Sequence, residues 1–240
     1  MNEEKLANVS VILPCYNEKE NILALIDAIH AELSDLSHEI VVVDDNSPDG
    51  TFKLVENAGL GYVKAFKRVA SPSLAESIRY GIDEAKGDVI VVMDSDFNHK
   101  PEYLNILIDN LKYYDCVSVS RFVYGGDMKN RFRHLSSWVF NIVTRILTKT
   151  FVTDSLFGYF AIRREELFKV DFDKVFWGYG DYCIRLMFYL QRNRASILQI
   201  PGVLGARLGG QGNSQLMKTL LQYASEVLKL VFVADKKMKD

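Results

Sequence analysis

The sequence is short of cysteine, of net charge and of long apolar runs. Its 240 residues include three cysteines, which lie far apart and form neither a disulfide framework nor a zinc pattern, so a reducing cytoplasm is the predicted location. The formal net charge of −2 provides no basic field, which argues against a nucleic-acid partner. Residues 1–5 lack the apolar core of a signal peptide, and no apolar run approaches the ~20 residues of a transmembrane helix. We therefore predict a protein without a transmembrane segment.

Two apolar runs that end in acidic residues are the most informative feature of the chain. They are Ile40-Val41-Val42-Val43 before Asp44-Asp45, and Val89-Ile90-Val91-Val92-Met93 before Asp94-Ser95-Asp96. Runs of this length, rich in β-branched residues, are typical of buried strands in a mostly parallel sheet. Ligands of such sheets bind outside the carboxyl ends of the strands, where these carboxylates are expected. Asp94 and Asp96 can both reach a divalent cation and a substrate phosphate, which indicates an enzyme that handles a nucleotide diphosphate.

Strand and helix patterns alternate along the first half of the chain. This alternation, with short connections, favours an α/β sandwich with a mostly parallel central sheet. In the second half we predict a helix at 135–148, strands at 158–162 and 196–200 as antiparallel additions to the sheet edge, and a final helix at 216–233. No linker or internal repeat divides the chain, so we predict one domain over residues 1–240.

Several motifs resemble those of a known family. VILPCYNE (11–18), VDDNSPDG (43–50) and MDSD (93–96) resemble the inverting family-2 glycosyltransferases. Within that family, DSDFNHKPE (94–102), SRFVYGG (120–126), the segment 133–137 and DSLFGYFAIR (154–163) are similar to the polyprenol-phosphate sugar synthases, a dolichyl-phosphate mannose synthase-like subgroup. The resemblance covers roughly residues 9–216 and implies a Rossmann-like fold of the GT-A type. It makes residues 9–120 a nucleotide-binding half and residues 121–233 an acceptor-side half.

The resemblance implies an enzyme that takes a hexose, with inversion, from a nucleotide diphosphate sugar such as GDP-mannose or a UDP-sugar. The residues that it implies for donor binding are Pro14, Tyr16, Glu18, Asp44, Asp45, Asp94, Ser95, Asp96 and Arg121. It further implies Mg²⁺ or Mn²⁺ on Asp94 and Asp96, with Asp96 as a catalytic residue, because a cation offsets charge on the leaving diphosphate. The residues alone leave other roles open. Asp94 and Asp96 could cap the next turn, Asp44 could pair with an interior arginine, and Asn17 could cap a helix.

On the acceptor side the resemblance implies a polyprenyl or dolichyl phosphate at a membrane surface. The residues that it implies for the acceptor phosphate are Arg131, Arg133, Ser137 and Arg207, with Arg133 also in a catalytic role. Arginine suits this task because its planar, permanently charged fork matches phosphate. A solvated basic face is the alternative for segment 127–133. The chain departs from the subgroup at Gly212-Asn213-Ser214-Gln215, where a lysine is usual at the last position, so a cation expected near phosphate is missing.

Asp181 connects the acceptor class to the mechanism. A phosphate is already a nucleophile at neutral pH, whereas a sugar hydroxyl, as in surface polysaccharide or glycan synthesis, requires a general base, for which Asp181 is the candidate. Asp181 is equally suited to cap a helix at 182–191. Two alternatives from other classes are a nucleotidyltransferase and a non-catalytic nucleotide-sugar binder. The first is disfavoured because residues 14–18 do not form a glycine-rich basic loop.

Two amphipathic helices bear on location and partners. In the helix at 135–148, Trp138, Ile142, Arg145 and Ile146 share one face, a composition typical of helices that lie in a membrane interface. Burial of this face in the core is the alternative. The helix at 216–233 has the same character and could instead form a homodimer surface or contact a membrane-anchored partner. We therefore predict a protein peripheral to the cytoplasmic face of a membrane.

Overall fold

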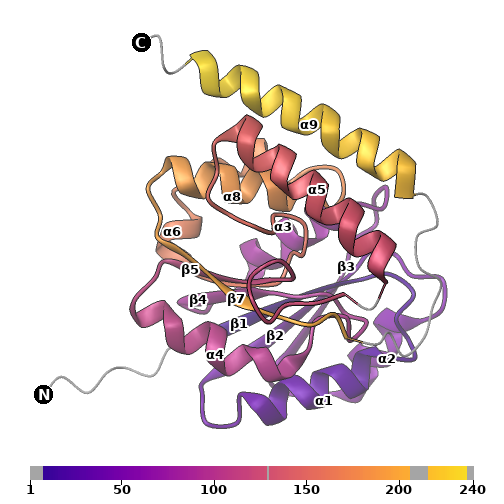
Figure 1. Ribbon diagram of the computed structural model, residues 1–240. Helices are drawn as coiled ribbons and strands as arrows, with labels where there is room; N and C mark the ends of the chain where they lie inside the picture. The colour runs from indigo at the N-terminus through magenta and orange to yellow at the C-terminus, as the bar shows by residue number, and fades with distance from the viewer. Residues whose placement is uncertain (1–7, 129, 206–215, 237–240) are drawn as a thin grey trace, which may run out of the picture.

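A computed structural model describes residues 8–128, 130–205 and 216–236 of the chain. One seven-stranded sheet forms its centre, with helices on both faces (Figure 1). In spatial order the strands are β3 (Val63–Lys67), β2 (His38–Asp44), β1 (Val9–Cys15), β4 (Val89–Val92), β6 (Phe160–Arg163), β5 (Cys116–Ser120) and β7 (Ile197–Pro201). The predicted α/β sandwich is confirmed.

The strands follow the prediction in the first half of the chain and depart from it in part in the second. β1, β2, β3 and β4 are parallel neighbours, and β1 and β4 are buried along their whole length, as expected for apolar strands covered on both faces. β6 runs antiparallel to both β4 and β5, and β7 runs parallel to β5 at the sheet edge. The prediction of two antiparallel edge strands is therefore correct in part for each strand. β6 is antiparallel but lies inside the sheet, and β7 lies at the edge but is parallel.

Helices on the two faces of the sheet enclose separate apolar cores. Those on one face are α1 (Ile22–Glu32), α2 (Thr51–Ala58) and α4 (Leu104–Asp109), the last flanked by the short helical turns η1 (Pro101–Tyr103) and η2 (Asn110–Lys112). Those on the other face are α3 (Leu74–Glu84), α6 (Arg164–Leu167), α7 (Phe172–Val175) and α8 (Tyr182–Arg192). A Cβ atom at Gly81 would lie 2.5 Å from Cγ2 of Ile12, so glycine lets α3 approach β1 closely.

Two further helices, α5 (Arg131–Thr148) and α9 (Leu216–Lys236), contact each other and form an outer layer beyond α8 (Figure 1). α5 begins before the predicted start at residue 135, because the side chain of Asn130 accepts a hydrogen bond from the N–H of Arg133 at 3.0 Å and caps the helix. Arg131 and Arg133 therefore stand in the first turn of α5. Across the described ranges, we find no helix with both the length and the apolar character to span a bilayer.

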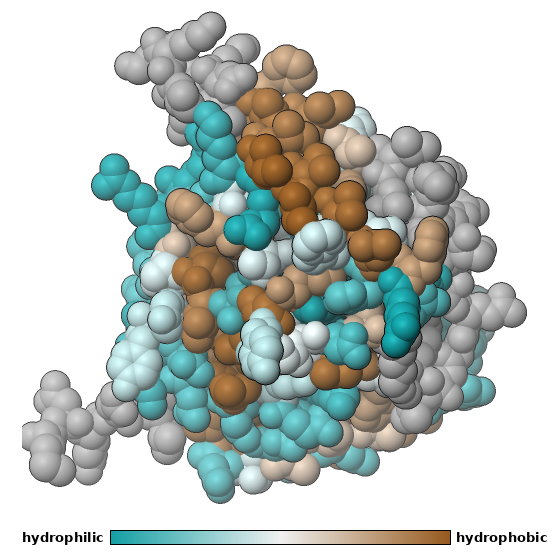
Figure 2. Space-filling view, in the orientation of Figure 1, coloured by the Kyte–Doolittle hydropathy of each residue, from teal (hydrophilic) through white to brown (hydrophobic). Residues whose placement is uncertain are grey.

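α5 carries polar side chains inward and apolar side chains outward. Asn141, Thr144 and Thr148 are buried, and Asn141 Oδ1 accepts a hydrogen bond from the N–H of Ser155 at 2.9 Å. The exposed apolar side chains of the helix are Phe132, Leu135, Trp138, Val139, Val143, Ile146 and Leu147. Figure 2 shows a continuous hydrophobic band along this helix. Burial of this face in the core, the alternative considered for α5, is therefore wrong.

Candidate functional site

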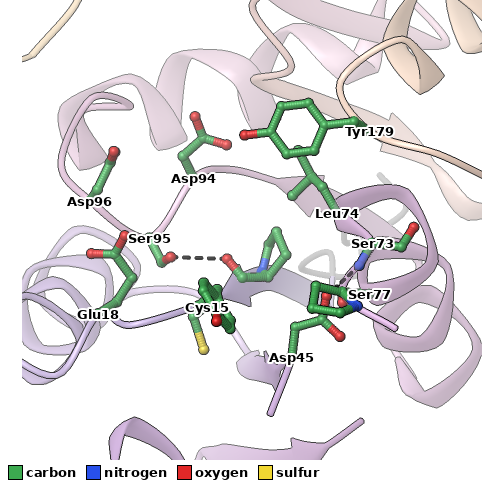
Figure 3. Close-up of a pocket in the computed structure, with 13 residues that line it drawn as sticks. Cys15, Glu18, Asp45, Ser73, Leu74, Ser77, Asp94, Ser95, Asp96 and Tyr179 are labelled. Carbon is green, nitrogen blue, oxygen red and sulfur yellow. Dashed lines mark hydrogen bonds between the residues drawn. The ribbon is translucent and has the colours of Figure 1, made fainter. Parts of the chain in front are cut away.

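A pocket of about 500 Å³ opens at the carboxyl ends of β1, β2 and β4 (Figure 3). Seven of the nine residues predicted to bind the donor line it: Pro14, Tyr16, Glu18, Asp45, Asp94, Ser95 and Asp96. These residues come from three loops that are distant in sequence. The parallel strands bring the loops together because their carboxyl ends meet at one edge of the sheet.

Hydrogen bonds between the loops hold the pocket wall. Ser95 Oγ donates to the carbonyl of Pro14 at 2.9 Å, which ties the loop after β4 to the end of β1 (Figure 3). The Asp45 carboxylate accepts a hydrogen bond from the N–H of Ser73 at 2.6 Å and pairs with Arg68 Nε at 3.2 Å. These contacts fix the end of β2 against the start of α3.

The two carboxylates of the segment Asp94-Ser95-Asp96 differ in burial. The side chain of Asp94 is 45% exposed and faces the same cavity as Tyr179 (Figure 3). Asp96 is 7% exposed, and its carboxylate accepts hydrogen bonds from the N–H and Nδ2 of Asn98 at 3.0 and 2.7 Å. The turn-capping alternative is therefore correct for Asp96. A carboxylate has about four lone-pair positions, so turn capping and ligand binding by one carboxylate are compatible in principle.

Asp44 lies beneath the pocket wall. Its side chain is fully buried, and its carboxylate accepts a hydrogen bond from the N–H of Ser47 at 2.8 Å. The Cys15 thiol lies 3.9 Å from the same carboxylate, and burial together with that negative charge raises the pKa of the thiol well above its usual value. In the described part of the chain the Asp44 carboxylate thus contacts the Ser47 N–H and the Cys15 thiol, and does not pair with an interior arginine. Its contact with the donor stays a prediction, and Asp45 is the carboxylate of this pair that lines the pocket.

The loop after β1 holds Glu18 by both its backbone and its side chain. Its N–H donates to Thr51 Oγ1 at 3.1 Å, and its carboxylate accepts a hydrogen bond from Asn21 Nδ2 at 2.7 Å. Asn17 adopts φ 60°, a left-handed conformation, and α1 begins only at Ile22. The prediction that Asn17 caps this helix was therefore wrong.

Arg121 is half of a buried ion pair. Its Nε and Nη2 donate to the two carboxylate oxygens of Asp154 at 2.7 and 2.9 Å, and the Asp154 side chain is fully buried. The guanidinium carbon also lies 5.1 Å from the ring centroid of Phe157. Among the described residues, Arg121 is not part of the pocket lining, so its contact with the donor stays a prediction.

Asp181 is the centre of a second buried network. Its carboxylate accepts hydrogen bonds from Arg185 Nη1 at 2.6 Å and from the N–H of Tyr179 at 3.0 Å. Arg185 also lies 3.4 Å from the carboxylate of Glu226 in α9 and stacks 3.8 Å above the ring centroid of Trp177. Within the described residues, the Asp181 side chain makes no capping hydrogen bond to α8, so that prediction was wrong. The Asp181 carboxylate instead forms an ion pair with Arg185, one turn into the helix.

The described residues predicted to bind the acceptor phosphate lie on α5. Arg131 and Arg133 are exposed in its first turn, and Ser137 Oγ accepts a hydrogen bond from Arg121 Nη2 at 3.5 Å. Arg207 and the segment 212–215 lie outside the described residues. The acceptor assignments therefore stay predictions.

Two further segments line the pocket without having been predicted from the sequence. Ser73, Leu74 and Ser77 come from the start of α3, and Tyr179 comes from the loop before α8. Ser73 Oγ donates to the carbonyl of Gly178 at 2.7 Å, so the two segments meet at the pocket. Turn and cap signals mark both segments in the sequence, but such local signals do not reveal that two turns about a hundred residues apart touch.

Comparisons with known proteins agree with this geometry. Residues 10–172 match the model of the family described as glycosyl transferase family 2. The chain is 34% identical over 230 residues to the dolichol-phosphate mannosyltransferase of Pyrococcus furiosus, covering 93% of this chain and 63% of that protein. The chain thus spans less than two thirds of that relative's length. It is also 34% identical over 202 residues to the polyprenol monophosphomannose synthase of Mycolicibacterium smegmatis, covering 80% of this chain and 75% of that protein.

Solved structures extend the fold comparison to lower identity. The glucosyl-3-phosphoglycerate synthase of Mycobacterium tuberculosis superposes with a TM-score of 0.71 at 21% identity, covering 94% of this chain and 78% of that one. This likeness confirms the predicted GT-A-type fold. Because the family model matches more than half of the chain, and two relatives exceed 30% identity over most of it, the chain belongs to glycosyl transferase family 2.

Proposed function

We propose that the protein is a glycosyltransferase that moves a hexose, with inversion, from a nucleotide diphosphate sugar to a polyprenyl phosphate. The observation that carries this proposal is the gathering of seven predicted donor residues in one pocket at the carboxyl edge of the sheet. Two relatives that cover most of the chain are named for the formation of mannosyl phosphates of dolichol or polyprenol. GDP-mannose is therefore the first donor to test, and a UDP-sugar is the second.

Different sides of the pocket suit the nucleoside and the diphosphate of such a donor. Figure 3 shows Asp45 and Ser77 on one side of the cavity and Asp94 and Asp96 on another. Asp45 offers a hydrogen-bond acceptor suited to a ribose or base, and the other two carboxylates offer hard oxygen atoms suited to a cation that carries a diphosphate. The nucleoside accordingly lies toward α3, and the diphosphate lies toward the loop after β4.

A divalent cation fits this donor set. Among the described residues, no group of three or more His, Cys, Asp or Glu side chains is arranged as a metal cage. Mg²⁺ is usually held by one or two carboxylates together with substrate phosphates and water, which matches Asp94 and Asp96. The related M. tuberculosis structure was crystallised with Mn²⁺ and UDP. When bound, Mg²⁺ or Mn²⁺ would offset the negative charge that develops on the leaving diphosphate.

A phosphate acceptor agrees best with the state of Asp181. A hydroxyl acceptor would require a general base, and Asp181 is fully buried with its carboxylate bonded to Arg185 at 2.6 Å. A phosphate acceptor needs no such base. Arg133, exposed and charged in the first turn of α5, is the proposed contact for the acceptor phosphate, and Arg131 stands two residues before it in the same turn.

The outward apolar face of α5 would bring this arginine to a lipid surface. Phe132, next to Arg133 in the chain, is 74% exposed, and Trp138 is 44% exposed further along the helix. Apolar side chains beside basic ones are the pattern of helices that lie at a membrane interface. Leu228 and Phe232 of α9 are also exposed. A second copy of the chain or a membrane-anchored partner is the alternative occupant of this face.

The test separates donor binding from acceptor use. Thermal unfolding with GDP, UDP, CDP and dTDP, each with and without Mn²⁺, identifies the base, because a ligand at about 100 times its Kd stabilises the folded state by ~2.7 kcal/mol. Transfer from the matching sugar nucleotide to a polyprenyl phosphate is then measured for Arg133→Ala, with Arg192→Ala, an exposed arginine on α8, as the control. We expect Arg133→Ala to raise the KM for the acceptor and leave donor binding unchanged. Loss of donor binding in that variant, or transfer only to a free sugar, would contradict the proposal.

A further inference from the structure

His99 is a buried side chain to which the proposed function gives no role. Its place shortly after the acidic segment 94–96 is typical of a turn residue, but in the structure its side chain is 1% exposed. Its Nδ1 lies 2.8 Å from the backbone nitrogen of Asp94, and its Nε2 lies 2.8 Å from the carbonyl oxygen of Phe157. The ring stacks on Tyr159 with 4.9 Å between the centroids.

The two backbone partners determine which ring nitrogen carries the proton. A backbone N–H can only donate and a carbonyl can only accept, so Nδ1 is the acceptor and Nε2–H is the donor. Burial lowers the pKa of His99 to about 4, which agrees with a neutral ring. Nε2 also lies 3.5 Å from the Asp94 carboxylate, so the ring contacts both the backbone and the side chain of that residue.

The loop that His99 contacts follows β4 and carries Asp94 and Asp96. β4 ends at Val92, and Phe97 has φ 64°, a left-handed conformation unusual for an aromatic residue. The Ser95 hydroxyl also ties this loop to the Pro14 carbonyl, Asp96 closes its turn, and the N–H of Gly205 donates to the carbonyl of Asn98 at 2.9 Å. Without an acceptor at residue 99, the N–H of Asp94 would lose the hydrogen bond that it donates to the buried ring, and a backbone donor that faces the interior without an acceptor is costly.

The other end of the His99 contact is anchored to the body of the protein. Phe157 belongs to the segment 153–158, in which Asp154 is paired with Arg121 and the Ser155 N–H donates to Asn141 of α5. This segment is thus fixed both to the loop after β5 and to α5. His99 therefore connects this fixed segment, through the Phe157 carbonyl, to the loop after β4, through the N–H of Asp94.

We propose that His99 is a positioning residue for cation and diphosphate binding: by accepting the hydrogen bond from the N–H of Asp94, it sets the conformation of the loop that carries Asp94 and Asp96. This inference rests on the proposed function, in which those two carboxylates hold the cation. Groups that orient metal ligands from behind typically change metal affinity or activity by ~10–100-fold when removed.

Three substitutions separate the two hydrogen bonds of the ring. His99→Asn keeps an acceptor near the position of Nδ1, His99→Gln keeps a donor near the position of Nε2, and His99→Leu keeps neither. Leu33→Ala, a buried core change at the carboxyl end of α1, is the control for lost stability. Mn²⁺ affinity in the presence of the nucleotide is measured by electron paramagnetic resonance, alongside kcat, KM for the donor and the melting temperature.

We expect His99→Leu and His99→Gln to weaken Mn²⁺ affinity by ~10–100-fold, the range for groups that orient ligands, while His99→Asn keeps most of it. Leu33→Ala should lower the melting temperature without changing that affinity. Equal losses in all three His99 variants, affinity retained by Gln and not by Asn, or affinity that tracks the melting temperature would each overturn the inference. If the unaltered protein binds Mn²⁺ and all variants match it, only this inference fails. If the unaltered protein binds no Mn²⁺ with any nucleotide, the proposed function fails as well.

Discussion

Replacement of Phe132 gives the most direct test of membrane contact by α5. Phe132 is 74% exposed at the start of the helix, next to Arg133. An aromatic side chain buries ~150–250 Å², so about 150 Å² of this ring is available for contact with lipid. At ~25 cal/mol per Å² of apolar surface, burial of half that area contributes roughly 2 kcal/mol. Phe132→Ser should therefore weaken liposome binding by roughly 30-fold.

The assay is co-sedimentation with vesicles that contain anionic lipid, followed by sugar transfer to vesicle-borne polyprenyl phosphate. Tyr113→Ser is the matched control, because Tyr113 is 73% exposed and lies between η2 and β5, away from α5. Detergent-dispersed acceptor should restore much of the rate of Phe132→Ser, since the pocket itself is unchanged. Equal vesicle binding by the two variants would refute the reasoning. A change in sedimentation coefficient without a change in vesicle binding would assign this face to a second copy of the chain.

Three further predictions concern the site and the stability of the fold. Asp96→Asn removes an anionic oxygen, so binding of GDP or UDP measured by calorimetry should lose most of its Mn²⁺ dependence and turnover should collapse; unchanged Mn²⁺-dependent turnover would contradict the metal assignment. Asp181→Asn leaves the guanidinium of Arg185 with a neutral partner and should lower the free energy of unfolding by up to ~3–5 kcal/mol, the cost of breaking a buried pair. Turnover of the folded Asp181→Asn protein should fall far less than the ~10²–10⁴-fold typical of a lost general base, and a loss in that range would favour a hydroxyl acceptor. Although burial opposes it, hydrogen bonds from Lys64, Ser10 and the backbone lower the pKa of Glu39 below its usual 4.5, so its contribution to stability is complete above that pH and lost as the pH falls through the folded-state pKa. Urea unfolding of Glu39→Gln should accordingly vary less with pH below 4.5 than unfolding of the unaltered protein.

Features that depend on neighbouring residues were predictable from the sequence. The apolar runs before Asp44 and Asp94 are β2 and β4, because consecutive β-branched residues favour an extended, fully covered strand. Since parallel strands end at one edge, placing the acidic loops there also located most of the pocket. The wall formed by the start of α3 and by Tyr179 was missed, because it depends on a contact between segments far apart in the chain.

Features that depend on distant partners were not predictable in this way. The position of β6 inside the sheet and the direction of β7 follow from their pairing with β4 and β5, which the apolar pattern of a strand does not encode. The sequence predicts that the Asp181 side chain caps α8, but its carboxylate pairs with Arg185 instead. Arg185 also forms an ion pair with Glu226 of α9. His99 follows an acidic loop and resembles a turn residue, but its carbonyl partner lies 58 residues later.

The reversed direction of β6 has a consequence for how such a fold can diversify. In the register with β4, Phe160 at the start of β6 lies opposite Val92 at the end of β4, so the segment that enters β6 arrives at the same edge from which the donor loops leave. That segment belongs to the stretch between α5 and β6 and carries none of the pocket-lining carboxylates. Phe157 in this segment accepts the hydrogen bond from His99, which in turn accepts one from the N–H of Asp94. Insertions or exchanges there can therefore change the approach from α5 and, through His99, the loop after β4 as well, so the two halves of the chain do not diversify independently.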